Sequence, residues 1–582
     1  MITSNYFEDN KDINFILNHV IDWETIVPLR ERGYHDANEY KKTNDEKFMY
    51  APTTVEEALE GYAAIHTQYG EIAGKELAPV AQAMDKKGLI FENGKVTFPS
   101  EMVKVVDLLA NSQLLGYTVR REYGGWNLPF AARASIMEMI SRADSSMGLT
   151  VGCFTLADVI EAFASDELKN EYIPKMASGE MCGAMSLTEP DYGSDLPHLK
   201  TKAVKQEDGT YLLTGNKRFI THACGFEDRP SVILTLARSK GEGAKGLSFF
   251  LVETRDIEVT RIEEKLGIHC SPTCEISYDN SKAKLVGEEG KGLIKYAMAM
   301  MNGARLAIGM QSLGVSEAAY REAAKYAGER VQFGIAIENI PAVANILDNM
   351  QALIQGQRAL VYRSSEIVDL YEGYYEEELE KGTEERAIRK VENVQKHDKL
   401  AKLLTPITKM FCSEISNQVA SDGVQIFGGS GYTEEFDAAR IFRDARITTI
   451  YEGTTQLQVL AIVGGVIDIT RDKSIIKDFL LDEIKQIGID KIEKLLTEEL
   501  EQMVNLANSY KEIDKEKKDR LTQDLVFPFS WLVTSIFLAK HIKIAQEKDS
   551  EYAISKEKYF NVFHGISMAE QAKHAVYIKS AL

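Results

Sequence analysis

The spacing of hydrophobic residues changes twice along this 582-residue chain, and these changes constrain its fold more than any other feature. From about residue 54 to residue 176, apolar residues recur at helical spacing, most clearly over 100–115. Between about residues 180 and 285, short runs rich in β-branched and aromatic residues alternate with Gly and Asp or Asn. Helical spacing returns near residue 292. A chain of this length is too long for one ordinary hydrophobic core, so we expect roughly two to four packed units. These units should be mainly α-helical, with a central β domain.

Four runs in the central region have the composition of strands: Tyr211–Thr214, Val232–Leu236, Leu247–Glu253 and Glu275–Tyr278. No long helical segment connects them, which disfavours a doubly wound parallel sheet and favours an antiparallel barrel or sandwich. After about residue 470, an apolar stripe that includes Ile476 and Leu480 predicts a further helical segment. The predicted division is an N-terminal extension (1–53), an N-terminal α-helical domain (54–179), a middle β domain (180–290), a C-terminal α-helical bundle domain (291–469) and a C-terminal helical extension (470–582).

Composition excludes several classes of partner and compartment. The formal net charge of −20, from 68 Lys and Arg against 88 Asp and Glu, repels polyanions and argues against a nucleic-acid partner. Six scattered cysteines form no disulfide framework, which favours a reducing compartment. The first residues are polar and acidic, unlike a signal peptide, so we expect the protein to be cytoplasmic.

Two local features have simple structural interpretations. Cys270 and Cys274 form a lone C-x3-C without a nearby His or further Cys, so we expect ordinary buried thiols and no metal site. The apolar run Val526–Ala539 is interrupted by polar residues and is shorter than the roughly 20 residues of a membrane span. We therefore expect this run to form a buried helix.

Two segments of the β region contain candidate ligand-binding residues. Neither a G-x-G-x-x-G fingerprint nor a P-loop is present in a suitable context, so a nucleotide would have to be held in another way. Residues 185–195 read M-S-L-T-E-P-D-Y-G-S-D, a loop that offers backbone N–H groups and hydroxyls without crowding. Residues 217–221 read K-R-F-I-T, and they are followed by His222 and Ala223. An isolated histidine such as His222 is usually structural.

The helical region contains three more motifs. Residues 329–334 read E-R-V-Q-F-G, and residues 424–432 read V-Q-I-F-G-G-S-G-Y. An arginine such as Arg330 suits pyrophosphate, and glycines allow close backbone approach to phosphate. The third motif is R-D-A-R-I at 443–447 followed by I-Y-E-G-T-T-Q at 450–456. Without further context, each motif is more simply an ordinary turn or a solvated charged residue.

Taken together, over about residues 52–468, these segments resemble the acyl-CoA dehydrogenase family in order and approximate spacing. The family motifs are T-E-P-x-x-G-S-D, W-I-T, E-R-x-x-F-G, Q-x-x-G-G-x-G-Y/F and R-D-x-x-I…I-Y-E-G-T-x-Q. The resemblance implies a helical domain, a β-barrel and a four-helix bundle. The C-terminal extension is similar in length and position to that of long-chain and very-long-chain members. This chain departs from the pattern at Phe219, where the family usually has Trp, and at His222-Ala223, where it has Asn-Gly.

The resemblance implies FAD as cofactor and an acyl-CoA thioester as substrate. The catalytic base would be Glu452, because the position that carries the base in some branches is Ala304 here. Residues implied to bind FAD are Met185, Leu187, Thr188, Gly193, Ser194, Phe219, Thr221, Arg330, Phe333, Gln425, Gly429, Thr454 and Gln456. Residues implied to line the substrate site are Ser194, Asn302, Arg305 and Gly453. Arg330 and Phe333 would contact the FAD of a neighbouring subunit, which implies a homodimer or homotetramer.

The implied reaction is α,β-dehydrogenation to the trans-2-enoyl-CoA in fatty-acid β-oxidation, with Glu452 removing the α-proton and flavin N5 accepting the β-hydride. Family members usually pass electrons to an electron-transferring flavoprotein. Two alternatives stay open: an acyl-CoA oxidase, and a non-catalytic assembly or interaction relative. For the extension, a pseudo-dimer lid, a membrane-surface contact and a plain helical packing domain all stay open.

Overall fold

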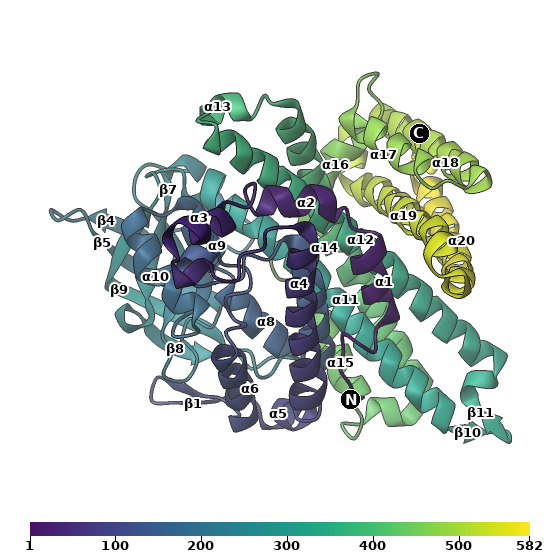
Figure 1. Cartoon of the computed structure of the whole chain (residues 1–582), viewed down its shortest axis with the longest axis horizontal. Helices are drawn as coiled ribbons and strands as arrows, with labels where there is room; N and C mark the ends of the chain where they lie inside the picture. The colour runs from purple at the N-terminus through teal and green to yellow at the C-terminus, as the bar shows by residue number, and fades with distance from the viewer. Residues whose placement is uncertain (582) are drawn as a thin grey trace. The chain divides into compact units, whose positions relative to one another are not determined.

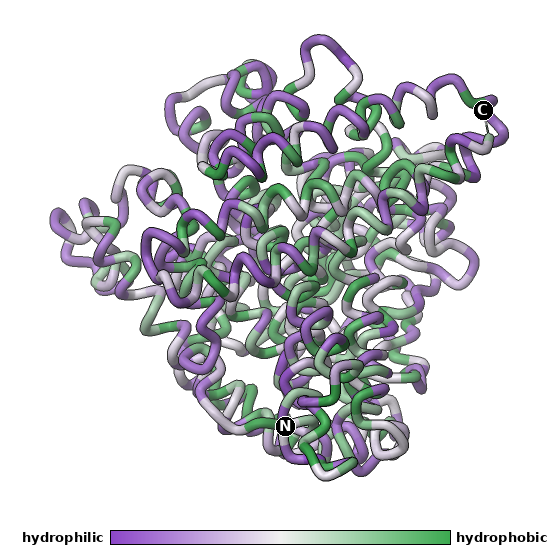
Figure 2. The backbone as a smooth tube through the Cα atoms, turned by 90° about the vertical axis from the view of Figure 1, so that its right-hand side faces the viewer, coloured by the Kyte–Doolittle hydropathy of each residue, from purple (hydrophilic) through white to green (hydrophobic). Residues whose placement is uncertain are grey.

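The computed structural model describes residues 1–581, which form two compact units. The first comprises residues 1–6, 33–129 and 139–304, and the second comprises residues 7–32, 130–138 and 305–581. Helices α7 (Phe130–Ala143) and α11 (Met298–Glu329) contribute residues to both units. Along the helices the backbone alternates between hydrophobic and hydrophilic residues, as expected for amphipathic helices that bury one face (Figure 2).

The first unit combines helices with a sheet domain, whose strands β4 (Lys202–Lys205), β5 (Tyr211–Thr221) and β9 (Thr273–Val286) lie at the left edge of the view in Figure 1. The helices of this unit are α3 (His35–Thr43), α4 (Val55–Glu71), α5 (Ala81–Lys87), α6 (Ser100–Asn111), α8 (Ser145–Phe154), α9 (Ala157–Phe163) and α10 (Asp166–Ala177). The predicted helix over 100–115 is confirmed only as far as Asn111. It ends there because Gln113 adopts a positive φ of 57°, although Leu115 is still buried.

The sheet domain of the first unit is a closed, mainly antiparallel arrangement. Its strands are β3 (Cys182–Ser186), β4 (Lys202–Lys205), β5 (Tyr211–Thr221), β6 (Ser231–Arg238), β7 (Leu247–Glu253), β8 (Glu258–Ile262) and β9 (Thr273–Val286). The short strands β1 (Ile90–Glu92) and β2 (Lys95–Thr97) form a separate antiparallel hairpin. Pairings run β4–β5–β9–β7–β6 and return from β6 to β4, so five strands close a ring. This agrees with the expected barrel, except that β3–β6 and β4–β6 pair in parallel. All four predicted strand runs lie within β5, β6, β7 and β9.

The second unit is helical apart from one short hairpin. Its elements, besides the shared α7 and α11, are α1 (Lys11–His19), α2 (Trp23–Arg30), β10 (Val331–Gln332), β11 (Ile335–Ala336), α12 (Pro341–Glu380), α13 (Glu385–Ile388), α14 (Glu392–Phe427), α15 (Asp437–Ala445), α16 (Thr455–Asp468), α17 (Ile475–Lys485), α18 (Asp490–Glu512), α19 (Lys515–Lys548) and α20 (Ser550–Ser580). The long helices α12 and α14 pack against each other in the bundle. The predicted class, mainly α with a central β domain and a helical extension, is confirmed. The predicted domain limits stay predictions.

The C-terminal extension packs on the bundle. Helices α19 and α20 run side by side, and both contact α12 (Figure 1). Phe411 of α14 meets Trp531 of α19 edge to face, with ring centroids 4.8 Å apart. The predicted stripe that includes Ile476 and Leu480 is buried on α17. Hydrophobic burial therefore holds the extension against the bundle.

The apolar run Val526–Ala539 lies inside α19, as expected. Two of its hydroxyls bond within the helix, since Ser530 donates to the Val526 carbonyl at 2.9 Å and Thr534 to the Ser530 carbonyl at 2.8 Å. The Ser535 hydroxyl donates instead to Oγ of Ser567 on α20 at 3.2 Å. By length and composition, the helical stretches Ser145–Phe163 and Lys515–Lys548 would suffice to cross a membrane. Their apolar windows are 61% and 89% buried inside the protein, as is usual for core helices.

Candidate active site

Glu452 lies in a tight turn of the second unit, between a short helical turn at Arg446–Thr449 and the start of α16. Its backbone φ is +54°, in the left-handed region that non-glycine residues rarely adopt, and Gly453 follows with φ +94°. A Cβ at position 453 would lie 2.7 Å from Nε2 of Gln458, so glycine is required there. Such strain persists only where the surrounding structure enforces it, and it is frequent at functional sites.

Several side chains enforce this turn. The Tyr451 hydroxyl donates to Oε1 of Gln311 on α11. Nε2 of Gln458 donates to the Gly453 carbonyl at 2.9 Å and to the Glu452 carbonyl at 3.2 Å. Nζ of Lys409, on α14, donates to the same Gly453 carbonyl at 2.8 Å. The turn is therefore anchored to α11, α14 and α16 at once.

The electrostatics of Glu452 combine burial with two nearby cations. Burial raises the pKa of the Glu452 carboxyl above its ordinary value, while Arg305 and Lys409 act in the opposite direction. Burial also lowers the pKa of the Arg305 guanidinium, against the effect of Glu452. A half-buried carboxylate with a raised pKa, flanked by cations, is a common arrangement for a general base.

Of the predicted site residues, Arg305, Gly453 and Thr454 lie around Glu452 in this unit. Arg305 follows Ala304 on α11, Gly453 and Thr454 complete the turn, and Gln456 is exposed in the first turn of α16.

The other predicted FAD contacts of the second unit lie at the far ends of the bundle helices. Arg330 and Phe333 belong to the hairpin after α11, and Phe333 is 94% exposed. Gln425 and Gly429 lie at the end of α14 and are exposed. Tyr326 of α11 stacks on Phe427 of α14 with ring centroids 4.4 Å apart, which brings these two helix ends together. An exposed aromatic next to an exposed Arg is free to meet a ligand or another subunit.

In the first unit, the loop at 187–195 is anchored to β5. The Lys217 ammonium, fully buried, donates to the Leu187 carbonyl at 2.8 Å and lies 3.1 Å from the Glu189 carboxylate. Burial lowers the pKa of Lys217 to about 8. Glu189 also accepts from the backbone N–H groups of Lys200 and Thr201 at 2.7 and 2.9 Å. Glu189, the acid of the T-E-P motif, is therefore a structural anchor.

This anchoring leaves the predicted ligand contacts of the first unit accessible. Phe219 has φ +62° and is 54% exposed, an unusual display of an aromatic side chain on a strand. The predicted contacts on the loop differ in exposure: Met185 and Thr188 are half-buried, Leu187 is buried, and Gly193 and Ser194 are exposed. Thr221 and Asn302 are half-buried.

His222 is structural, as expected. It is fully buried, and its Nε2 lies 2.9 Å from Oγ1 of Thr150. Cys270 and Cys274 are buried free thiols.

Sequence reasoning missed the residues that support the turn: Lys409, Gln311 and Gln458. None belongs to a diagnostic motif segment. The only available signal was polarity inside otherwise apolar helix faces, as at Lys409 between Ile407 and Met410.

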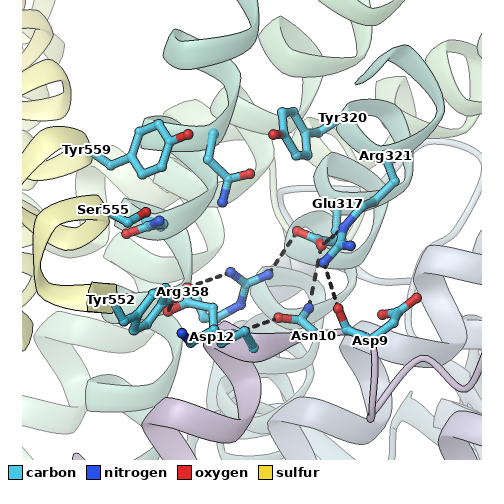
Figure 3. A pocket seen from close by; sticks show the side chains of 13 residues that line it. Asp9, Asn10, Asp12, Glu317, Tyr320, Arg321, Arg358, Tyr552, Ser555 and Tyr559 are labelled. Atoms are coloured by element: carbon cyan, nitrogen blue, oxygen red, sulfur yellow. Dashed lines mark hydrogen bonds and ion pairs between the residues drawn. The ribbon is translucent and has the colours of Figure 1, made fainter. Parts of the chain in front are cut away.

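A second polar feature of this unit is a cavity of about 310 Å³ lined by residues of α11, α12 and α20 and by the N-terminal segment. Figure 3 shows Arg358 directed at Asp12 and Glu317, with Tyr320 and Tyr559 facing each other across the cavity. Nη1 of Arg358 is 2.7 Å from Asp12, and its Nη2 is 3.0 Å from Glu317. These charges pair with one another, so we regard the network as structural.

Models of one protein family match most of this chain. The acyl-CoA dehydrogenase N-terminal domain matches residues 60–180, the middle domain matches 184–281, and the C-terminal domain matches 290–379 and 374–467. The 3-methylmercaptopropionyl-CoA dehydrogenase of Ruegeria pomeroyi is 33% identical over 481 residues, covering 78% of this chain and 75% of that protein. The chain belongs to the acyl-CoA dehydrogenase family. It is a flavin-dependent oxidoreductase whose cofactor is FAD.

Solved structures of acyl-CoA dehydrogenases share this fold. The acyl-CoA dehydrogenase of Bacillus anthracis complexed with FAD is 25% identical, with a TM-score of 0.74, and covers 90% of this chain and 88% of that chain. A structure described as the electron transferring flavoprotein of Acidaminococcus fermentans, in work on flavin-based electron bifurcation, is 31% identical with a TM-score of 0.59 and covers 69% of this chain and 97% of that chain. The wider coverage of the B. anthracis structure shows that its likeness extends to the long form of the fold.

Proposed function

We propose that this acyl-CoA dehydrogenase oxidises a saturated acyl-CoA thioester to the trans-2-enoyl-CoA, with Glu452 as the base that removes the α-proton. The observation that carries the proposal is the strained turn that holds the Glu452 carboxylate beside Arg305 and Lys409. No carboxylate stands at position 304, the alternative position of the base in the family.

The reaction breaks a weakly acidic α C–H bond and removes a hydride from the β carbon. Bound FAD supplies the hydride acceptor at N5. Burial raises the pKa of Glu452 and so makes its carboxylate a stronger base, while Arg305 and Lys409 favour the ionised form. The backbone N–H of Glu452 would donate to the thioester carbonyl and stabilise the developing enolate. Arg305 would bind a negatively charged part of the CoA moiety.

The residues present suit FAD. The exposed aromatic ring of Phe219 and the hydroxyls of Thr188 and Thr221 would contact the flavin. Arg330 and Phe333, exposed on the hairpin after α11, would contact the adenosine diphosphate portion of the FAD of a neighbouring subunit. The remaining proposed contacts are Met185, Leu187, Gly193, Ser194, Gln425, Gly429, Thr454 and Gln456. A shared FAD makes the protein a homo-oligomer, either a homodimer or a homotetramer.

Three further assignments complete the proposal. Electrons leave through an electron-transferring flavoprotein, in keeping with the likeness to the A. fermentans structure. The enzyme is cytoplasmic, in keeping with six free cysteines. The substrate is a fatty acyl-CoA in β-oxidation or a related short thioester, as the name of the R. pomeroyi relative suggests.

Anaerobic flavin bleaching tests the proposal. The purified holoenzyme would be mixed with straight-chain acyl-CoAs of increasing length and with 3-methylmercaptopropionyl-CoA, and flavin absorbance would be followed. At least one thioester should bleach the flavin. With that substrate, Glu452→Gln should keep FAD and bind the thioester but bleach about 10² to 10⁴ times more slowly. Glu498→Gln, a change of an exposed carboxylate on α18, is the matched control.

The outcomes separate the alternatives. Absence of bleaching with every thioester would support a non-catalytic relative. Rapid reoxidation of the bleached flavin in air, with stoichiometric hydrogen peroxide, would support an oxidase. Bleaching of Glu452→Gln within a few-fold of the unmodified enzyme would show that another residue takes the proton.

A further inference from the structure

Lys409 is a buried charge in the middle of the long helix α14. Its side chain has no solvent exposure, and burying an ammonium group is costly unless it is compensated. The compensation is directed at the catalytic turn, because Nζ donates to the Gly453 carbonyl at 2.8 Å. A hydrogen bond from a charged donor is about twice as strong as a neutral one.

The Gly453 carbonyl is a sensitive point of the turn. It follows directly on Glu452, and both residues have positive φ values, 54° and 94°. A non-glycine residue in this region is strained, so the turn needs external support. Gln458 donates to the same carbonyl at 2.9 Å, and thus two donors from different helices fix its orientation.

The charges that face Lys409 come from three elements. They are Glu414 of α14 itself, Glu452 of the turn and Arg305 of α11. Glu414 accepts a hydrogen bond from the Thr455 hydroxyl at the start of α16, so it is already engaged by the other end of the turn. Lys409 and Arg305 are thus the cations that favour the ionised form of Glu452 against its burial.

We propose that Lys409 is a positioning residue for dehydrogenation: its ammonium group fixes the Glu452 turn through the Gly453 carbonyl and stabilises the ionised Glu452 carboxylate. This inference rests on the proposed function of Glu452 as the base. Two separable effects follow, since the hydrogen bond determines the geometry and the charge determines the protonation of Glu452.

The charge effect has a definite sign. Without the positive charge of Lys409, burial of Glu452 is opposed only by Arg305, so the pKa of Glu452 rises further. The carboxylate then takes up its proton at a higher pH, and the acid limb of the pH–rate profile moves upward. One nearby opposite charge typically shifts a carboxyl pKa by 1–3 units, and we expect about one unit here because Arg305 makes the larger contribution.

The test is the rate of anaerobic flavin bleaching at saturating substrate, measured from about pH 5 to pH 9 on FAD-loaded enzyme. Lys409→Met removes both charge and donor, whereas Lys409→Gln removes the charge but keeps an N–H donor. Both should move the acid limb upward by about one pH unit, and Lys409→Met should also lose more rate above the limb. Lys402→Met, at a side chain 65% exposed on the same helix, should leave the profile unchanged.

Lys409→Arg and the unmodified enzyme provide a second measurement if the neutral variants lose FAD. Arginine keeps the charge, so its acid limb should coincide with that of the unmodified enzyme. Burial lowers the pKa of Lys409 to about 8, so the unmodified profile should show an inflection near pH 8 that the arginine variant lacks.

The inference would be overturned if the acid limb did not shift in either Lys409→Met or Lys409→Gln. A loss of rate that is equal at every pH, without such a shift, would show that Lys409 only packs in the core. An upward shift of the acid limb in Lys409→Arg as large as the shift in Lys409→Met would also overturn the inference. These failures are distinct from failure of the proposed function. That failure would appear as absence of bleaching in the unmodified enzyme, or as bleaching of Glu452→Gln within a few-fold of the unmodified enzyme, and either result would remove this inference as well.

Discussion

Arg358→Met should destabilise the second unit, because Arg358 joins three acidic side chains from separate segments. Its guanidinium, 1% exposed, contacts Asp12 of α1 at 2.7 Å, Glu138 of α7 at 2.5 Å and Glu317 of α11 at 3.0 Å. Methionine fills similar space without charge. Glu138 is affected most, since Asp12 also contacts Lys556 of α20 and Glu317 also contacts Arg321.

The expected cost follows from the burial of these groups. Breaking a buried ion pair by removing one partner typically costs about 3–5 kcal/mol, since the remaining charge is left without compensation. Burial already raises the pKa of Glu138 even with Arg358 present, so in the variant Glu138 should take up a proton instead. For a unit of this size, such a loss corresponds to a fall of roughly 3–10 °C in the midpoint of thermal unfolding.

Thermal unfolding of FAD-loaded enzyme, followed by circular dichroism, would measure the effect. The double variant Arg358→Met with Glu138→Gln should recover part of the loss, because the stranded carboxylate is gone. Arg386→Met, at an exposed position on α13, should change the midpoint little. A midpoint for Arg358→Met within about 1 °C of the unmodified enzyme, or a double variant less stable than the single one, would refute this account of the network.

Three other predictions concern the site and its surroundings. Gly453→Ala should slow flavin bleaching while the enzyme keeps FAD, because φ is +94° and the added Cβ would lie 2.7 Å from Nε2 of Gln458. Gly464→Ala should not slow it, because no atom lies within 4 Å of a Cβ at that position. Arg330→Ala should weaken FAD binding about tenfold to a hundredfold in a fluorescence titration; unchanged affinity would contradict a shared cofactor. Burial lowers the pKa of His222 to about 4, so between pH 6.5 and pH 4 the unfolded state gains a proton that the folded state does not. The free energy of unfolding should therefore fall by about 3 kcal/mol over this range, and the midpoint of thermal unfolding of His222→Gln should fall less on acidification.

Much of the fold followed from residue patterns. The runs that became β5, β6, β7 and β9 located the sheet domain, because β-branched and aromatic residues bounded by Gly and Asp or Asn favour strands. Helical spacing in the extension identified α17, whose apolar stripe is buried. The parallel pairing of β3 with β6 was not predictable from composition, because it joins strands that are far apart in the sequence.

By itself, the sequence determined the family, the cofactor and the identity of the candidate base, because each depends on ordered motifs such as the I-Y-E-G-T-T-Q segment around Glu452. Only the tertiary structure decided what makes that glutamate unusual. Its left-handed backbone, its burial and the support from Lys409 depend on α11, α14 and α16 meeting at one turn. No sequence motif predicts the partner of Lys409, because that partner is a backbone carbonyl, of Gly453, 44 residues away along the chain.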